Sequence, residues 1–313
     1  MAYTQTSSVG SDTAAFEQLA YFALRSQPMF EMACDVKSTN QSHPGASVQF
    51  NIYADLAQAT GSLTETSDVT AVAMSDSTVT VTLAEKGNAV ITTAKLRGTS
   101  FLNVDADAAN VIGYNMVDSL DNIVHDVLVG GSNEAWAGDA TATANIDAAD
   151  NLAATDVRKE VAALRSASVQ PYANGTYLGF IHPDVSYDLR DDTAVTDIIQ
   201  YQIRQDGAAV RQGSIGTFGG VDFIETPRLD IVADAGASSV DVYNTIIVGK
   251  QALAKAHSRG AGFGADPGIV FGPVTDTLRR FQPVGWYHLV GYSRFREAAI
   301  RRIEAASSIG ANT

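Results

Sequence analysis

Two short segments near the start of the chain alternate between apolar and polar residues, and this pattern constrains the fold more than any other feature. Residues 47–53 and 77–83 both show the period of two that is typical of β-strands. The apolar faces comprise Val48, Phe50 and Ile52 in the first segment and Val79, Val81 and Leu83 in the second. The intervening residues 57–76 are rich in Thr, Ser and Ala and contain only three charged residues. Because a two-stranded ribbon is marginally stable alone, this pattern predicts a long hairpin over 46–83 that contacts a partner surface.

The strongest helical signal covers residues 104–128. Its apolar side chains recur at steps of three and four, the spacing of one helix face. These side chains are Ala109, Ile112, Met116, Leu120, Ile123 and Val127. Asn103 and Asp105 suit the start of a helix, and Gly130–Gly131 suits its end. At 1.5 Å per residue the predicted helix spans roughly 35 Å, which is long for a single domain.

The rest of the chain mixes shorter helices and strands without a regular βαβ repeat. Thr155 is expected to cap a helix, and Pro183 is expected to open another directly after a strand at 176–182. A tight turn into a strand is expected at 218–225, further strands at 240–248 and 284–295, and further helices at 14–23 and 192–204. This order predicts the α+β class.

Composition excludes several functional classes. The chain has 313 residues, enough for one large or two modest domains, and a net charge of -14. A protein whose main task is to grip nucleic acid is usually basic, so the charge argues against a polymerase or repressor. No run approaches the roughly 18 apolar residues of a membrane span, and the polar first ten residues do not resemble a signal peptide. A cytosolic product is therefore expected.

Residues that carry chemistry are sparse and scattered. The single cysteine, Cys34, is expected to be a buried small hydrophobe. The five histidines show no metal-ligand spacing, so no metal or cofactor site is expected. His182 and Asp184 form the best-placed acid-base pair, at the end of a strand. They admit two interpretations, an active site or a helix whose first turn contains Asp184, and we favour the second. The glycines of 260–264 are expected to form a loop.

Charge is segregated along the chain. Residues 103–131 contain five Asp and no Lys or Arg, whereas residues 274–304 contain six Arg and three acidic residues. Both segments can be solvated faces of one molecule. In a protein that stacks on copies of itself, they can also pair between subunits.

Three segments of the second half carry a resemblance to a known family. Residues 177–191 read YLGFIHPDVSYDLRD, residues 213–226 read GSIGTFGGVDFIET, and residues 284–304 read VGWYHLVGYSRFREAAIRRIE. Together with the preceding polar arm, long hairpin and acidic helix, they resemble the major capsid proteins of tailed bacteriophages, which have the Hong Kong 97 type of fold. The resemblance covers about residues 30–305.

The resemblance implies a division of the chain. It comprises an N-terminal arm (1–45), an extended hairpin loop (46–83), a peripheral domain with the long helix at about 104–128 (84–174), an axial domain (175–283), and a return strand to the peripheral domain with a C-terminal tail (284–313). One founding member of the family joins its subunits covalently through a Lys and an Asn. Residues 57–77 contain no Lys, so such a cross-link is not expected here.

The resemblance also implies a non-enzymatic function. The protein is expected to assemble in pentamers and hexamers into an icosahedral shell around double-stranded DNA, within the virion, after synthesis in the host bacterial cytoplasm. Expected partners are a separate scaffolding protein, a portal, decoration proteins and non-specifically contacted DNA, with no membrane. Expected intersubunit contacts are Leu63, Val69, Val72, Asp118, Asp121, Arg294, Arg296, Arg301 and Arg302. Two alternatives remain, a shell protein of an encapsulin-type nanocompartment and a cytosolic enzyme that uses His182 and Asp184.

Overall fold

The computed structural model describes most of the chain and divides it into two compact units. The described residues are 25–38, 45–100, 103–172, 175–192, 217–258, 266–274 and 276–309. The first unit comprises Met1–Arg25, Lys86–Val117 and Asp266–His288, and the second comprises Ser26–Glu85, Asp118–Ala265 and Leu289–Thr313. The helix expected at 14–23, nearly all of that expected at 192–204, and the loop expected at 260–264 lie outside the described residues.

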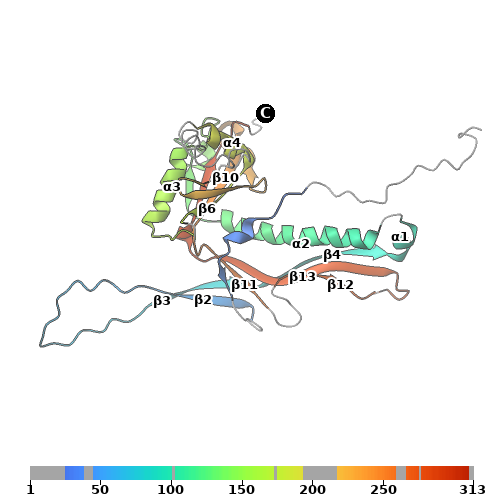
Figure 1. Ribbon diagram of the computed structural model, residues 1–313, viewed down its shortest axis with the longest axis horizontal. Coiled ribbons are helices and arrows are strands. Elements are labelled where there is room, and N and C mark those ends of the chain that lie inside the picture. The colour runs from blue at the N-terminus through green and yellow to red at the C-terminus, as the bar shows by residue number, and fades with distance from the viewer. Residues whose placement is uncertain are drawn as a thin grey trace, which may run out of the picture. The chain divides into compact units, whose positions relative to one another are not determined.

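The expected hairpin is confirmed. Strands β2 (Ser47–Tyr53) and β3 (Asp76–Thr82) pair antiparallel, from Ser47 opposite Thr82 to Tyr53 opposite Asp76. The loop that joins them, 54–75, is exposed at every position and continues beyond the ends of both strands (Figure 1).

The apolar face of this hairpin is partly covered by its own chain, which supplies part of the partner surface expected for it. Val48 and Val81 are buried against Ala254 and Ala256 of strand β11 (Leu253–His257). A face of the same molecule therefore covers the base of the hairpin, and the loop beyond it is the part left in solvent.

The long helix is also confirmed. Helix α2 extends from Val104 to Val129 (Figure 1). It contributes residues to both units. The Asn103 side chain accepts a hydrogen bond from the Ala106 N–H at 3.5 Å, and Gly130 follows the last helical residue. The 26 residues of α2 correspond to about 39 Å at the usual rise per residue.

A seven-stranded sheet forms the centre of the second unit. Its order is β5-β14-β10-β6-β8-β7, and β9 also pairs with β10. The strands are β5 (Glu134–Trp136), β6 (Tyr177–Ile181), β7 (Thr217–Phe218), β8 (Val221–Glu225), β9 (Ile231–Val232), β10 (Val242–Val248) and β14 (Ile300–Ala305). Every residue of β10 is buried, as expected of a strand that is covered on both faces.

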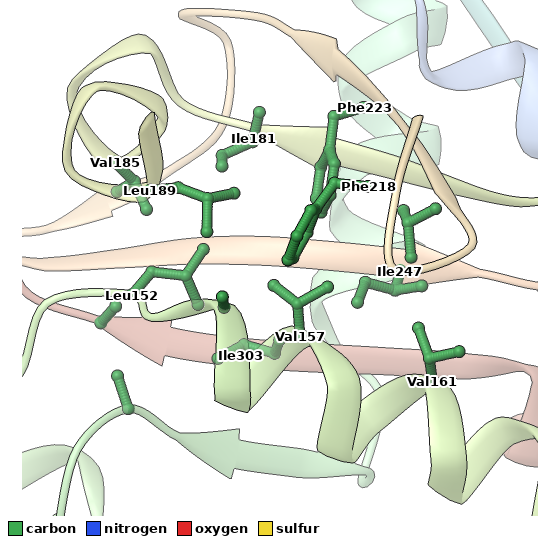
Figure 2. Close-up of a cluster of buried hydrophobic side chains, with 14 of the residues drawn as sticks. Leu152, Val157, Val161, Ile181, Val185, Leu189, Phe218, Phe223, Ile247 and Ile303 are labelled. Atoms are coloured by element: carbon green, nitrogen blue, oxygen red, sulfur yellow. The ribbon is translucent and has the colours of Figure 1, made fainter. Parts of the chain in front are cut away.

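Two clusters of apolar side chains cover the faces of this sheet. On one face, helices α3 (Ala154–Ser166) and α4 (Pro183–Asp191) pack their apolar residues against the sheet (Figure 2). This cluster includes Leu152, Val157, Val161, Ile181, Val185, Leu189, Phe218, Phe223, Ile247 and Ile303. The second cluster joins Phe30, Val124, Leu128, Phe180 and Ile246. Each fully buried side chain of this size contributes roughly 1.5–3 kcal/mol of transfer free energy.

The start of α3 differs from the sequence prediction, whereas the turn before β8 agrees with it. The expected cap at Thr155 is wrong, because α3 begins at Ala154 and Thr155 lies inside it. The carboxylate of Asp156 instead accepts a hydrogen bond from the Ala153 N–H at 3.3 Å. The expected tight turn before β8 is confirmed at Gly219 and Gly220, with φ of 60° and 91°, which glycine adopts without steric cost.

The first unit contains shorter elements around part of strand β13 (Phe281–Arg294). Strands β4 (Ala84–Thr93) and β12 (Gly268–Phe271) pair with β13, and helix α1 (Ala94–Thr99) follows β4. In the second unit the later residues of β13 pair with β11, and the two-residue β1 (Val36–Lys37) pairs with β11. Short 3₁₀ helices cover Phe30–Ala33, Thr143–Asn145, Ala237–Ser239 and Glu297–Ala299. Within the described residues, no helix has the length and apolar character needed to cross a membrane.

Candidate assembly surfaces

His182 and Asp184 form the start of a helix. His182 is the N-cap of α4, and its Nδ1 accepts a hydrogen bond from the Asp184 N–H at 3.2 Å. The Asp184 carboxylate in turn accepts a hydrogen bond from the Tyr243 hydroxyl at 3.2 Å. Burial lowers the pKa of His182, and the nearby Asp184 charge opposes this shift. The expected place of Asp184 in the first turn is confirmed, and the Nδ1 lone pair serves the backbone.

Replacement of His182 tests this capping role. His182→Ala should lower the free energy of unfolding by about 1 kcal/mol, because the Asp184 N–H loses its acceptor. His182→Asn should retain most of that free energy, since its side-chain oxygen can accept the same bond. Urea unfolding followed by circular dichroism measures both. Equal losses for the two variants would contradict the capping role.

Cys34 has the environment of an inert thiol. Its side chain is buried, and burial, reinforced by the Glu31 carboxylate, raises the pKa of the thiol to about 12. The expected buried hydrophobe is confirmed.

A thiol reagent should report this environment directly. The native subunit should react with an aromatic disulfide reagent at least tenfold more slowly than the unfolded chain, because little thiolate forms and access is blocked. Cys34→Ser should still form particles, with a modest loss of stability from its buried hydroxyl. Fast labelling of the native subunit, measured by absorbance, would show that the thiol is accessible.

The loop 54–75 carries apolar side chains in solvent. Leu63, Val69 and Val72, expected as contact residues, are 78%, 61% and 72% exposed. Met74 is also exposed, by 70%. Apolar side chains gathered on one long loop are a typical interaction surface.

Asp118 and Asp121 contact an arginine of their own chain that sequence analysis missed. Arg228 donates from Nε to the Asp121 carboxylate at 3.1 Å and from Nη1 to Asp118. Asp121, which is 3% exposed, also accepts a hydrogen bond from the Phe30 N–H at 2.7 Å. Burial raises the pKa of the Asp121 carboxyl, and the Phe30 N–H and Arg228 oppose this shift. The cluster thereby ties Phe30 to α2.

Three of the four C-terminal arginines also have acidic partners in their own chain. Arg294 Nε lies 2.8 Å from Glu297, Arg301 Nε lies 3.8 Å from Glu160, and Arg302 Nη2 lies 3.0 Å from Glu304. Arg302 also contacts Glu134. Arg296 differs from them, because it is exposed and has no ion-pair partner among the described residues. The intersubunit roles expected for these arginines stay predictions.

One group of described residues has the composition of a metal site. His125, Asp126 and Asp230 offer ligand atoms that lie within 4.8 Å of one another. His125 Nε2, however, accepts a hydrogen bond from the Asp230 N–H at 3.3 Å. A neutral imidazole that accepts at Nε2 carries its proton on Nδ1, the atom that lies 3.7 Å from a carboxylate oxygen of each aspartate. This arrangement suits a hydrogen-bond donor better than a metal ligand.

The geometry defines a class of protein before any comparison. Exposed apolar side chains gather on the long loop 54–75, as is typical of a protein that contacts other molecules. The profile of the family described as phage capsid protein matches residues 5–309, and the chain belongs to this family. It is therefore a structural protein of the phage capsid, and virion capsid is its location.

Solved capsid structures share the fold. The capsid asymmetric unit of cyanophage Pam1 matches with a TM-score of 0.76 and 16% identity, over 98% of this chain and 99% of that chain. The capsid of Ralstonia phage GP4 matches with a TM-score of 0.75 and 15% identity, over 97% of both chains. The capsid of Helicobacter pylori bacteriophage KHP30 matches with a TM-score of 0.71 and 11% identity, over 98% and 99%. These matches confirm the Hong Kong 97 type of capsid fold. No curated protein sequence matches the chain.

Proposed function

We propose that copies of this chain assemble as pentamers and hexamers into an icosahedral shell that encloses the double-stranded DNA of a tailed bacteriophage. The capsid family and the full-length fold matches support this proposal. The strongest structural support comes from the loop 54–75, because Leu63, Val69 and Val72 are exposed in the single subunit. Burial of such side chains between copies supplies a favourable free energy that one copy lacks.

Electron microscopy of the purified protein tests the proposal. The protein should form closed particles of uniform size, alone or with its scaffolding protein. Particles purified from infected cells should contain nuclease-protected double-stranded DNA. Closed particles that contain protein cargo instead of DNA would support the nanocompartment alternative. A protein that stays monomeric under all these conditions and turns over a substrate would support the enzyme alternative.

The division of the chain into domains and the further partners are part of the same proposal. We infer an N-terminal arm, a peripheral domain with α2, and an axial domain that begins near residue 175. We also propose that the chain is made in the host cytoplasm and that its partners are a separate scaffolding protein, a portal and decoration proteins. DNA contact is proposed to be non-specific and weak, since a chain with a net charge of -14 repels DNA and leaves an enclosed genome free.

The contact residues are proposed in two groups. Leu63, Val69 and Val72 supply apolar area on the hairpin loop. Among the charged positions Arg296 is the strongest candidate, because the described residues leave its charge unpaired. The remaining positions, Asp118, Asp121, Arg294, Arg301 and Arg302, would act between subunits in addition to the ion pairs they make within one chain.

A further inference from the structure

A small hollow in the second unit brings together two cations from different parts of the chain. Its volume is about 290 Å³, and its walls come from the turn after α3, the turn between β10 and β11, and the segment after β13. Lys250 and Arg296 line it, together with the polar residues Ser168, Gln170 and Gln251.

Backbone hydrogen bonds hold these walls in place. The Lys250 N–H donates to the Gln170 carbonyl at 2.9 Å, which joins two of the three segments. The Gly249 N–H donates to the Ala299 carbonyl at 2.8 Å, which joins the third. A Cβ at Gly249 would lie 2.3 Å from the Val169 side chain, so the close approach requires glycine. The hollow is therefore built from fixed backbone.

Two residues at the rim adopt a conformation that side-chain-bearing residues rarely take. Ser168 has a φ of 57° and Gln251 a φ of 61°. The Gln251 N–H donates to the Asp35 carboxylate at 2.6 Å, and the Ser168 N–H donates to the Arg165 carbonyl at 3.0 Å. Left-handed residues cluster at ligand sites when surrounding contacts hold them.

Neither cation of the hollow forms an ion pair with a described acidic residue, although the Asp35 carboxylate lies at the rim on the Gln251 N–H. The neighbour of Arg296 in the sequence is Glu297. The Glu297 carboxylate instead accepts hydrogen bonds from the Ser132 N–H and from Arg294.

The end of α3 does not need these cations either. The carbonyls of Ala163, Leu164 and Arg165 already accept hydrogen bonds from the N–H groups of the turn that follows the helix. In a chain with 35 acidic and 21 basic residues, two unmatched cations in one hollow favour an external anion.

We propose that this hollow binds a compact oxyanion, with the Lys250 ammonium and the Arg296 guanidinium as its cationic donors. Phosphate and carboxylate share the required chemistry, since both accept charge-assisted hydrogen bonds through paired oxygens. The anion has two possible sources, free phosphate or an acidic side chain of a second copy. The second source rests on the proposed shell function, whereas binding of free phosphate does not.

Titration of the full-length subunit with inorganic phosphate tests the proposal by calorimetry. Wild-type protein should show saturable binding, and Lys250→Gln and Arg296→Gln should each weaken it about tenfold, through loss of one charged donor. Lys95→Gln is the matched control, since Lys95 is an exposed lysine of α1 in the first unit. This variant should bind phosphate with the affinity of the wild type. Far-UV circular dichroism confirms that each variant is folded.

Assembly of the same variants distinguishes the two sources. Variants that lose phosphate binding but form normal particles identify free phosphate as the ligand. Loss of particles in both variants, together with inhibition of wild-type assembly by phosphate, identifies an acidic side chain of a second copy. Absence of saturable phosphate binding in the wild type, or equal affinity in all four proteins, would overturn the proposal even if particles form normally.

Discussion

A subunit whose residues 54–75 are replaced by an Asn-Gly turn should fold and stay soluble but form no closed particles. Tyr53 pairs directly with Asp76, so a two-residue turn can join the strands without a change of register. The base of the hairpin is covered by β11 of the same chain, so the melting temperature of the subunit should change by only a few degrees. Sedimentation velocity measures assembly, and circular dichroism measures melting.

A triple substitution separates loop chemistry from loop length. Leu63→Ser, Val69→Ser and Val72→Ser together should also abolish particles, because each side chain loses most of its roughly 1.5–3 kcal/mol of burial per copy. The control replaces polar neighbours in the same loop, with Ser62→Ala, Thr64→Ala and Thr70→Ala, and should assemble normally. Particles of normal size from the serine variant would show that the apolar contacts are dispensable. Loss of the subunit's own melting transition would show that the loop belongs to the core.

Arg228→Ala should lower the free energy of unfolding of the isolated subunit by about 3–5 kcal/mol. The substitution leaves the Asp121 carboxylate, which is 3% exposed, without its cation. The Phe30 N–H, which donates to the same carboxylate, then stays as a neutral donor to a buried charge. Urea unfolding of the subunit under conditions that prevent assembly gives the measurement.

Two comparisons test the reason for this loss. Arg280→Ala breaks an exposed ion pair with Asp276 and should leave the unfolding midpoint near that of the wild type. Arg228→Met combined with Asp121→Leu removes both buried charges and should cost less than Arg228→Ala alone. A double variant as unstable as Arg228→Ala would show that packing, and not the uncompensated charge, explains the effect.

Elements with a local signal were predictable from the sequence. The hairpin strands, α2, the strand before Pro183 and the Gly219–Gly220 turn follow from periodicity and turn residues, which act within a few positions. The motifs of the second half also carried the family resemblance, which the match over residues 5–309 confirms.

Elements with a weak local signal were missed. Strand β11 contains Lys255, which is 7% exposed and contacts Glu31 and the ring of Tyr292. A lysine in a short segment does not indicate a buried strand, because its burial requires partners from distant segments. Strand β4 contains Gly87 and lacks clear alternation, so its pairing with β13 decides its conformation.

The partners of the charged residues also could not be predicted from local sequence patterns. The sequence showed that acidic and basic residues are segregated, but Asp118 and Asp121 pair with Arg228, more than 100 positions away, and Arg301 pairs with Glu160. The hollow that contains Lys250 and Arg296 likewise joins three segments of distant sequence.

The hairpin, the long helix, the α+β class and the resemblance to capsid proteins could be predicted from the sequence, because periodicity, turn residues and motifs are properties of neighbouring positions. The tertiary structure was needed to show which surfaces are free. It covered the hairpin base with β11, left the loop 54–75 in solvent, and paired most of the segregated charges within one chain. Burial and ion pairing depend on which distant segments the fold brings within a few ångströms, and no local pattern encodes that distance.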